Sequence, residues 1–179
     1  SLDSDRAVQT HRIVVQNREV ESRMARLEVN YYPWFPTEGE RVASVSRDIE
    51  IRPSVDNEYV VQVPVEHPQL WETKSPTLYR VEVILTDKDG QPLDNLATTT
   101  GIRTIEQREG TLYVNHHVEM LNGAQIMGHR YPVETAAKTN RCVPAETVVR
   151  DLLMIKKMNG NLLRIHVHAE KDTIDGIND

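Results

Sequence analysis

Hydrophobic and polar residues alternate over most of the first 105 residues, in short runs separated by turn residues. In the run 78–86, Tyr79, Val81, Val83 and Leu85 occupy every second position, which is typical of a strand with one buried face. The predicted strands cover residues 12–16, 23–32, 48–52, 59–65, 78–86 and 95–106. About seven short strands with frequent turns and no helical period predict a β-sandwich.

The pattern changes after Gly110. Residues 112–121 predict a small hairpin that turns at Asn115 and His116. Apolar residues then recur at helical spacing over 144–158, and Asn159–Gly160 is a helix stop. A strand over 161–168 and a helix from 172 onward follow, an order typical of a parallel α/β fold. We therefore expect a mainly β chain with two domains, residues 1–106 and 107–179.

Charge and composition exclude several function classes. The net charge of −6 argues against nucleic acid, which requires a basic surface. No apolar run approaches the roughly 20 residues that a bilayer-spanning helix needs, and the N-terminus lacks the apolar core of a signal peptide. Cys142 is the single cysteine, so no internal disulfide can form, and the compartment stays unknown.

Several segments together resemble glycoside hydrolase family 2. They are His67-Pro-Gln-Leu-Trp71, Ser75-Pro-Thr-Leu-Tyr79, Gly101-Ile-Arg103-Thr-Ile-Glu106, Leu112-Tyr-Val-Asn115, Met120-Leu-Asn-Gly123 and the stretch from Asp151 to Arg164. They follow in the family's order over residues 67–179. The resemblance implies an immunoglobulin-like sandwich followed by a hairpin and by strand 1, helix 1 and strand 2 of a truncated (β/α)8 barrel.

The same resemblance implies the function. The parent would be a retaining exo-β-glycosidase that hydrolyses terminal β-linked sugars, β-galactosidase-like, with a carbohydrate substrate and no cofactor. The family's two catalytic glutamates lie on barrel strands four and seven. Because a barrel needs about 250 residues, both would lie beyond Asp179, so this chain contains no catalytic residue and is expected to be inactive.

Candidate substrate-binding residues also follow from the resemblance. On the strand 161–168, Leu162, Arg164, His166 and His168 share one face, which becomes polar toward the carboxyl end, where barrel chemistry sits. Arg164 matches the family's active-site arginine, which orients and polarises a catalytic carboxylate. Either histidine could contact substrate or only fill the barrel, since the spacing differs by one residue from the family's arginine–histidine motif.

The segment after Gly123 departs from the family. Its usual substrate-contacting asparagine and histidine are replaced by Gln125 and Met127, and His129 with Arg130 could compensate. A His-x-His pair on a strand is also compatible with zinc, but no further ligands follow it, so no metal is expected.

One alternative is a non-catalytic sandwich module that binds carbohydrate or mediates assembly. A free-standing sandwich has no use for the helix and strand after residue 110, which favours the first interpretation. Trp71 and Tyr79 are expected in the core. The aromatic segment 31–35, with Pro33 and Pro36, suits a loop or a strand end and could line an interdomain surface. The apolar faces of residues 107–179 predict packing against the sandwich or self-association.

Overall fold

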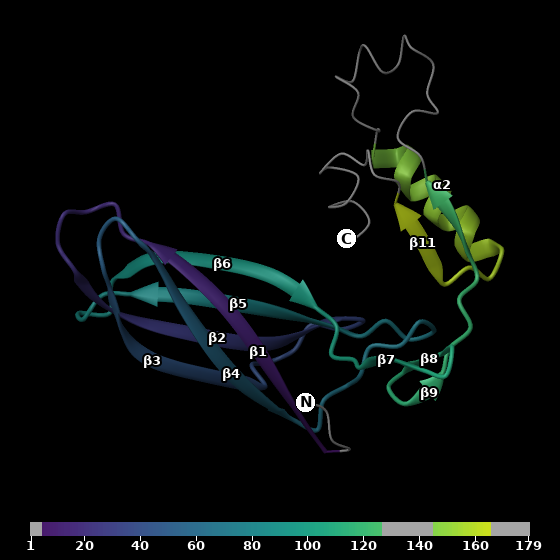
Figure 1. Cartoon of the computed structure of the whole chain (residues 1–179), viewed down its shortest axis with the longest axis horizontal. Coiled ribbons are helices and arrows are strands. Elements are labelled where there is room, and N and C mark those ends of the chain that lie inside the picture. Colours follow the sequence, from purple (N-terminus) through teal and green to yellow (C-terminus); the bar gives the residue numbers. More distant parts are fainter. Residues whose placement is uncertain (1–4, 127–144, 166–179) are drawn as a thin grey trace, which may run out of the picture. The chain divides into compact units, whose positions relative to one another are not determined.

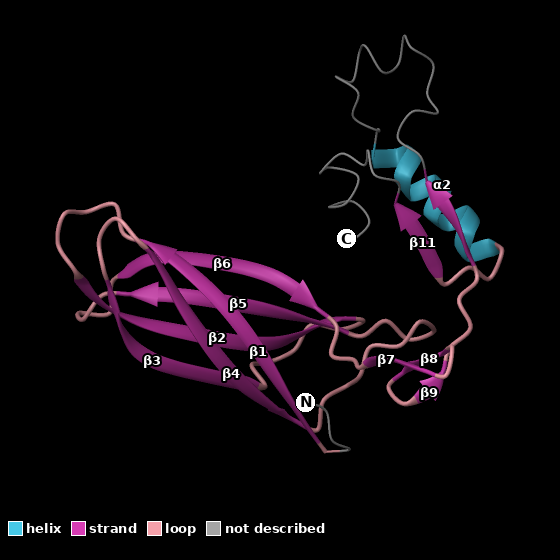
Figure 2. Ribbon diagram, viewed as in Figure 1, coloured by secondary structure: helices cyan, strands magenta, loops and turns pink. Residues whose placement is uncertain are grey.

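The computed structural model describes residues 5–126 and 145–165, which form two compact units, Ser1–Val118 and Glu119–Asp179. The first contains two packed sheets and a small separate sheet (Figure 1). The described part of the second contains two strands and a helix (Figure 2). The domain boundary predicted after residue 106 stays a prediction.

The predicted β-sandwich is confirmed. A two-stranded sheet pairs β1 with β4, and a four-stranded sheet has the order β3-β2-β5-β6, all antiparallel. The strands are β1 (Arg6–Gln16), β2 (Arg23–Phe35), β3 (Ala43–Ile51), β4 (Asp56–Glu66), β5 (Leu78–Thr86) and β6 (Pro92–Thr100). No residue between 5 and 118 is helical.

The core follows directly from the alternation. On β2, Ala25, Leu27, Val29 and Tyr31 are each at most 4% exposed, and the same period buries Val61, Val63 and Val65 on β4 and Tyr79, Val81 and Leu85 on β5. Burying one such side chain contributes about 1.5–3 kcal/mol, so the sandwich needs no disulfide. Tyr79 lies in the core as predicted, whereas Trp71 is only half-buried.

A polar contact between two rings joins the two sheets. His11 on β1 and Tyr31 on β2 share a hydrogen bond, with Nε2 and the phenol oxygen 2.6 Å apart. Their rings meet edge to face, and the Tyr79 ring lies next to that of Tyr31. Burial lowers the pKa of His11 and raises the pKa of Tyr31. Both groups are therefore kept neutral inside the sandwich.

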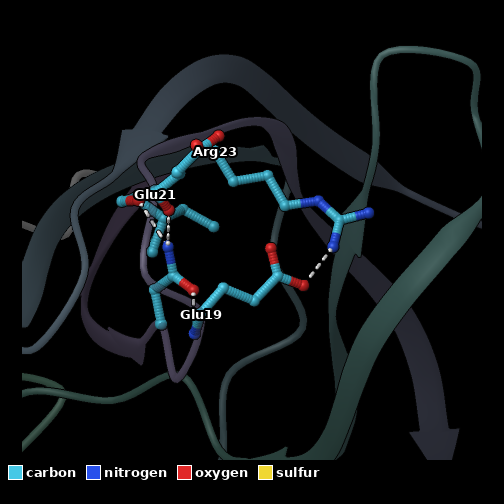
Figure 3. A network of polar contacts seen from close by, with 5 residues as sticks. Glu19, Glu21 and Arg23 are labelled. Carbon is cyan, nitrogen blue, oxygen red and sulfur yellow. Dashed lines mark hydrogen bonds and ion pairs between the residues drawn. The ribbon is translucent and has the colours of Figure 1, made fainter.

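The connection from β1 to β2 is closed by side chains (Figure 3). The Asn17 amide donates to the carbonyls of Glu21 and Ile51, and its oxygen accepts the backbone N–H of Glu19. Arg23 forms an ion pair with Glu19 at 3.1 Å. Asn17 thereby supplies partners that an irregular turn cannot supply from its own backbone.

The single strand predicted over 95–106 is wrong. The structure has β6 up to Thr100 and a separate β7 (Ile105–Arg108), with an irregular segment between them. There Trp71 donates its backbone N–H to Ile102, and the buried Asn115 side chain donates to the Trp71 carbonyl and accepts from the Thr104 N–H. These contacts from distant residues take the backbone of this segment out of the sheet.

The predicted hairpin is confirmed. β7, β8 (Thr111–Val114) and β9 (His117–Val118) form a three-stranded antiparallel sheet. The chain turns between β8 and β9 at Asn115 and His116, which both have positive φ. As a result β7 belongs to this sheet, and six strands make up the sandwich.

The second unit is a βαβ arrangement. Its described residues contain β10 (Gly123–Ile126), α2 (Ala145–Lys157) and β11 (Leu162–Ile165), with β10 and β11 paired in parallel. The helix predicted over 144–158 is confirmed as α2. In the described part of the chain, no helix has the length and apolarity needed to cross a membrane. The helix predicted from 172 lies outside the described residues.

Candidate functional site at the carboxyl ends of two parallel strands

Arg164 and Gln125 lie side by side near the carboxyl ends of β11 and β10. They are paired in the parallel register, and the guanidinium of Arg164 donates a hydrogen bond to the side-chain oxygen of Gln125. Both residues are exposed. The guanidinium has five N–H donors in a planar fork. Donors therefore remain for an anionic or hydroxyl-bearing group.

The register that brings these two residues together is set where both strands begin. Asn161 donates to Glu119 Oε1 and to the Met120 carbonyl, at 2.6 and 2.9 Å, and accepts the Asn122 N–H at 2.8 Å. Its own backbone N–H donates to the Asn122 carbonyl. One side chain thus fixes β11 against the segment that leads into β10.

A glycine allows the two strands to come this close. A Cβ on Gly123 would lie 1.9 Å from the Leu162 carbonyl oxygen, far inside van der Waals contact. Any other residue at the start of β10 would push the strands apart or shift their register. The pairing of Gln125 with Arg164, two residues further along both strands, depends on this approach.

The helix α2 ends in a compact cap that leads into β11. Asn159 has a left-handed backbone, with φ 57°, while Gly160 N–H donates to the Ile155 carbonyl and Asn159 N–H to that of Lys156. This is the Schellman pattern, in which the residue after the helix needs positive φ. On the helix, Val148 and Asp151 are buried, and Arg150 Nε lies 3.8 Å from Asp151 Oδ1.

The structure describes two of the residues predicted for the site. It brings Arg164 and Gln125 into contact, although nothing in the sequence indicated that they bond to each other. His129, His166 and His168 lie outside the described residues, so their roles stay predictions. Within residues 5–126 and 145–165, no three histidine, cysteine, aspartate or glutamate side chains gather as a metal site requires.

Sequence reasoning missed the structural role of two asparagines, whose side chains hydrogen-bond to distant segments. Asn161 fixes the start of the βαβ unit, and Asn115 joins the β7–β8–β9 sheet to the loop that carries Trp71. Both are part of the segments that resemble the family. Asn115 is only 6% exposed. A polar residue beside an apolar strand was the available signal, since a buried amide must find partners.

Comparison with known proteins places the chain in a family. The profile of glycosyl hydrolases family 2 matches residues 1–103, more than half of the chain. A β-galactosidase of Kluyveromyces lactis is 28% identical over 126 residues, which cover 70% of this chain and 12% of that protein. A β-galactosidase of Photobacterium profundum is 30% identical over 119 residues, or 66% of this chain and 11% of that protein.

Solved structures share the fold. A Bacteroides uniformis β-glucuronidase matches with a TM-score of 0.79 and 22% identity, covering 97% of this chain and 20% of that one. A family 2 glycosyl hydrolase from Bacteroides cellulosilyticus matches with a TM-score of 0.82 and 22% identity, covering 98% and 22%. The chain spans only about an eighth of its curated relatives' length. With the sandwich in place and the profile matched over it, this chain belongs to glycosyl hydrolases family 2.

Proposed function

We propose that this chain is part of a retaining exo-β-glycosidase that acts on terminal β-linked sugars. In this proposal residues 1–106 are the sandwich scaffold, and residues 107–179 open the catalytic (β/α)8 barrel. The supporting observation is the parallel β10–α2–β11 arrangement with Arg164 and Gln125 at the strands' carboxyl ends. In (β/α)8 barrels the active site is built at that end of the strands.

The role proposed for Arg164 follows from its chemistry. An arginine beside a carboxylate favours the ionised form of that carboxylate, and a retaining glycosidase needs an ionised nucleophile. Gln125 would hold the guanidinium in place through the bond that Arg164 donates to it. His166 and His168, and His129 after β10, would contribute contacts to the sugar. Curated relatives carry the name β-galactosidase, which supports a β-galactoside as substrate.

The chain of residues 1–179 is proposed to be inactive on its own. Retaining hydrolysis requires two carboxyl groups about 5–5.5 Å apart across the glycosidic bond. The proposal assigns both to barrel strands beyond Asp179. The 27 acidic residues of this chain are then scaffold and surface residues.

The test compares the chain with a longer protein that continues through a whole barrel. p-Nitrophenyl β-galactoside, β-glucuronide and β-mannoside are offered to both. We expect turnover only by the longer protein, with kcat/KM falling at least roughly tenfold in R164M and folding unchanged. Turnover by residues 1–179 that survives further purification contradicts the proposed inactivity. No turnover of any substrate by the longer protein contradicts the glycosidase proposal.

A further inference from the structure

The aromatic segment at the end of β2 forms a surface cluster that the glycosidase proposal does not use. On β2 the core side chains are Ala25 to Tyr31 at every second position, so Tyr32 lies on the opposite, outer face of the four-stranded sheet. On β5, Arg80 sits between the buried Tyr79 and Val81 and so shares that outer face. Tyr32 and Arg80 are direct cross-strand partners.

A β-bulge turns further aromatic residues toward the same face. Pro33 pairs with Tyr79 and Phe35 with Leu78, so Trp34 is an extra residue in β2. Without the bulge, Phe35 would follow the core-facing period of Tyr31. With it, Phe35 pairs with Leu78, which lies on the face of Arg80. Bulges redirect side chains in this way at functional places in sheets.

Arg80 organises the rings. Its guanidinium carbon lies 5.1 Å from the Tyr32 ring centroid and 5.2 Å from that of Trp34. Both distances are within the range of cation–π attraction. Arg80 Nε is also 3.1 Å from Glu82 Oε1, and this ion pair is about a third exposed. The rings nevertheless keep open surface, since Trp34 is 37% and Phe35 48% exposed.

The backbone around this cluster is held in place. Beyond the end of β2 the chain folds back, with Gly39 N–H donating to the Pro33 carbonyl at 3.1 Å and Val42 N–H to the Tyr31 carbonyl at 2.9 Å. The rings therefore stand on a fixed backbone. A preformed surface binds with less ordering cost than a loop that must first be organised.

The surroundings limit the kind of ligand. Further along the same face, ion pairs join Arg41 to Glu28 at 3.2 Å and Arg26 to Asp48 at 3.8 Å. Charged side chains therefore lie beside the aromatic cluster on this face, whereas a specific protein interface needs about 800 Å² on each partner. A single flat ring suits it better.

We propose that Tyr32, Trp34 and Phe35, with the Arg80–Glu82 pair, form an accessory binding site for a pyranose ring. One face of a pyranose presents C–H groups, which pack on aromatic rings, and its rim presents hydroxyls that donate and accept hydrogen bonds. Guanidinium N–H groups donate to such hydroxyls and carboxylate oxygens accept from them. Thr99, the cross-strand partner of Arg80 on β6, adds an exposed hydroxyl on the same face. This site needs no catalytic barrel, so it can be tested independently of the proposed function.

The test uses residues 1–179 and three probes: lactose, cellobiose and methyl β-glucuronide. The chain has two tryptophans, so its ¹H–¹⁵N spectrum carries two indole signals, and W34F identifies that of Trp34. We expect at least one probe to shift the Trp34 signal saturably and to leave that of Trp71 in place. R80M, followed on the Trp34 signal, should weaken binding roughly tenfold. W34A has no such signal, so its binding is followed on the backbone amide signals of the cluster, and it should weaken by a similar factor.

The matched control is R47M, because Arg47 also lies over a tyrosine ring, 5.3 Å from the centroid of Tyr59, but without a tryptophan. R47M should bind like the unaltered chain. Circular dichroism and the melting temperature check that every variant is folded. Should W34A be unfolded, R80M, which keeps the Trp34 indole, carries the test. The proposal is overturned if no probe shifts the Trp34 signal, or if folded R80M and R47M bind equally well.

Discussion

Gly101 lies directly against the side chain of Trp71. A Cβ placed on Gly101 would be 2.7 Å from Trp71 Cβ, Cγ and Cδ1. The guanidinium carbon of Arg103 lies over the same indole, 4.6 Å from the ring centroid. The backbone N–H of Trp71 also donates to the Ile102 carbonyl, so Trp71 and the segment after β6 hold each other in place.

G101A is therefore expected to destabilise the sandwich. The added methyl group forces Trp71 or the backbone to move, and such overpacking costs about 1–3 kcal/mol. The measurement is urea unfolding of the chain followed by circular dichroism. G39A is the control, because its Cβ would lie 3.2 Å from Pro33 Cγ, a contact that a small shift relieves. Equal stability of G101A and the unaltered chain would falsify this packing account.

The burial of His11 makes stability depend on pH. Burial lowers the pKa of His11 below its usual value of 6.5, so the fold disfavours the protonated ring. The unfolded chain takes up that proton first. The stability contributed by neutral His11 is thus complete above about pH 6.5 and is lost as pH falls toward the lower folded pKa.

Two variants check this prediction. Y31F removes the hydrogen bond and should cost about 0.5–1.5 kcal/mol at pH 8. H11M removes the titrating group and should flatten the decline in unfolding free energy between pH 7 and 5. H67Q alters an exposed histidine and should leave the decline as it is. A decline in H11M as steep as in the unaltered chain would assign the effect to other groups.

The Asn161 amide is expected to control the βαβ unit alone. N161D keeps the oxygen that accepts from Asn122 but loses the two donated bonds and faces Glu119 with a like charge. Losing them should cost about 1–3 kcal/mol. Amide hydrogen exchange should accelerate in α2 and β11 and stay unchanged in β2 and β5.

N159G is the matched control for N161D. Asn159 already has φ 57°, a conformation that glycine adopts without a Cβ penalty. This variant should leave exchange in α2 unchanged or slow it. Faster exchange in N159G than in N161D would show that the helix cap, rather than the Asn161 network, holds the unit together.

Self-association through α2 is the fourth prediction. Val149, Leu153 and Met154 on this helix, and Met158 directly after it, are each at least half exposed. Light scattering should show a mass that rises with concentration, and L153E should restore a monomer, because a buried charge is costly. V20E is the control, since Val20 is 92% exposed in the β1–β2 connection. A monomer at all concentrations would contradict the prediction.

Sequence reasoning succeeded where the determinants are local. Strand β5 was predicted with its bounds because its alternation is strict. Helix α2 was predicted because its apolar residues recur at helical spacing and Asn159–Gly160 ends the helix. β1 was predicted to begin at residue 12 but begins at Arg6. Residues 6–11 are polar apart from Ala7 and Val8, and their strand character comes from pairing with the far end of β4, where Ala7 lies opposite Val65.

The errors arise where distant residues decide. The break between β6 and β7 is held by Trp71 and Asn115, which no local pattern in 95–106 reveals. Likewise Gln125 and Arg164 were each singled out, but their contact depends on the parallel register, which the Asn161 network fixes. In both places the sequence indicated which residues matter, but it could not indicate which distant residues they contact.

The pairing of β1 with β4 also dictates the order in which a growing chain can fold. Gln16 pairs with Asp56 and Arg6 with Glu66. At least 40 further residues must therefore be synthesised after a residue of β1 before its partner on β4 exists. At about 5–20 residues per second, that wait on the ribosome lasts roughly 2–8 s. Meanwhile β2 and β3, which are neighbours in sequence, can already form their hairpin. Within the sandwich, β1 is thus synthesised before the other strands but is added to a sheet that later strands begin.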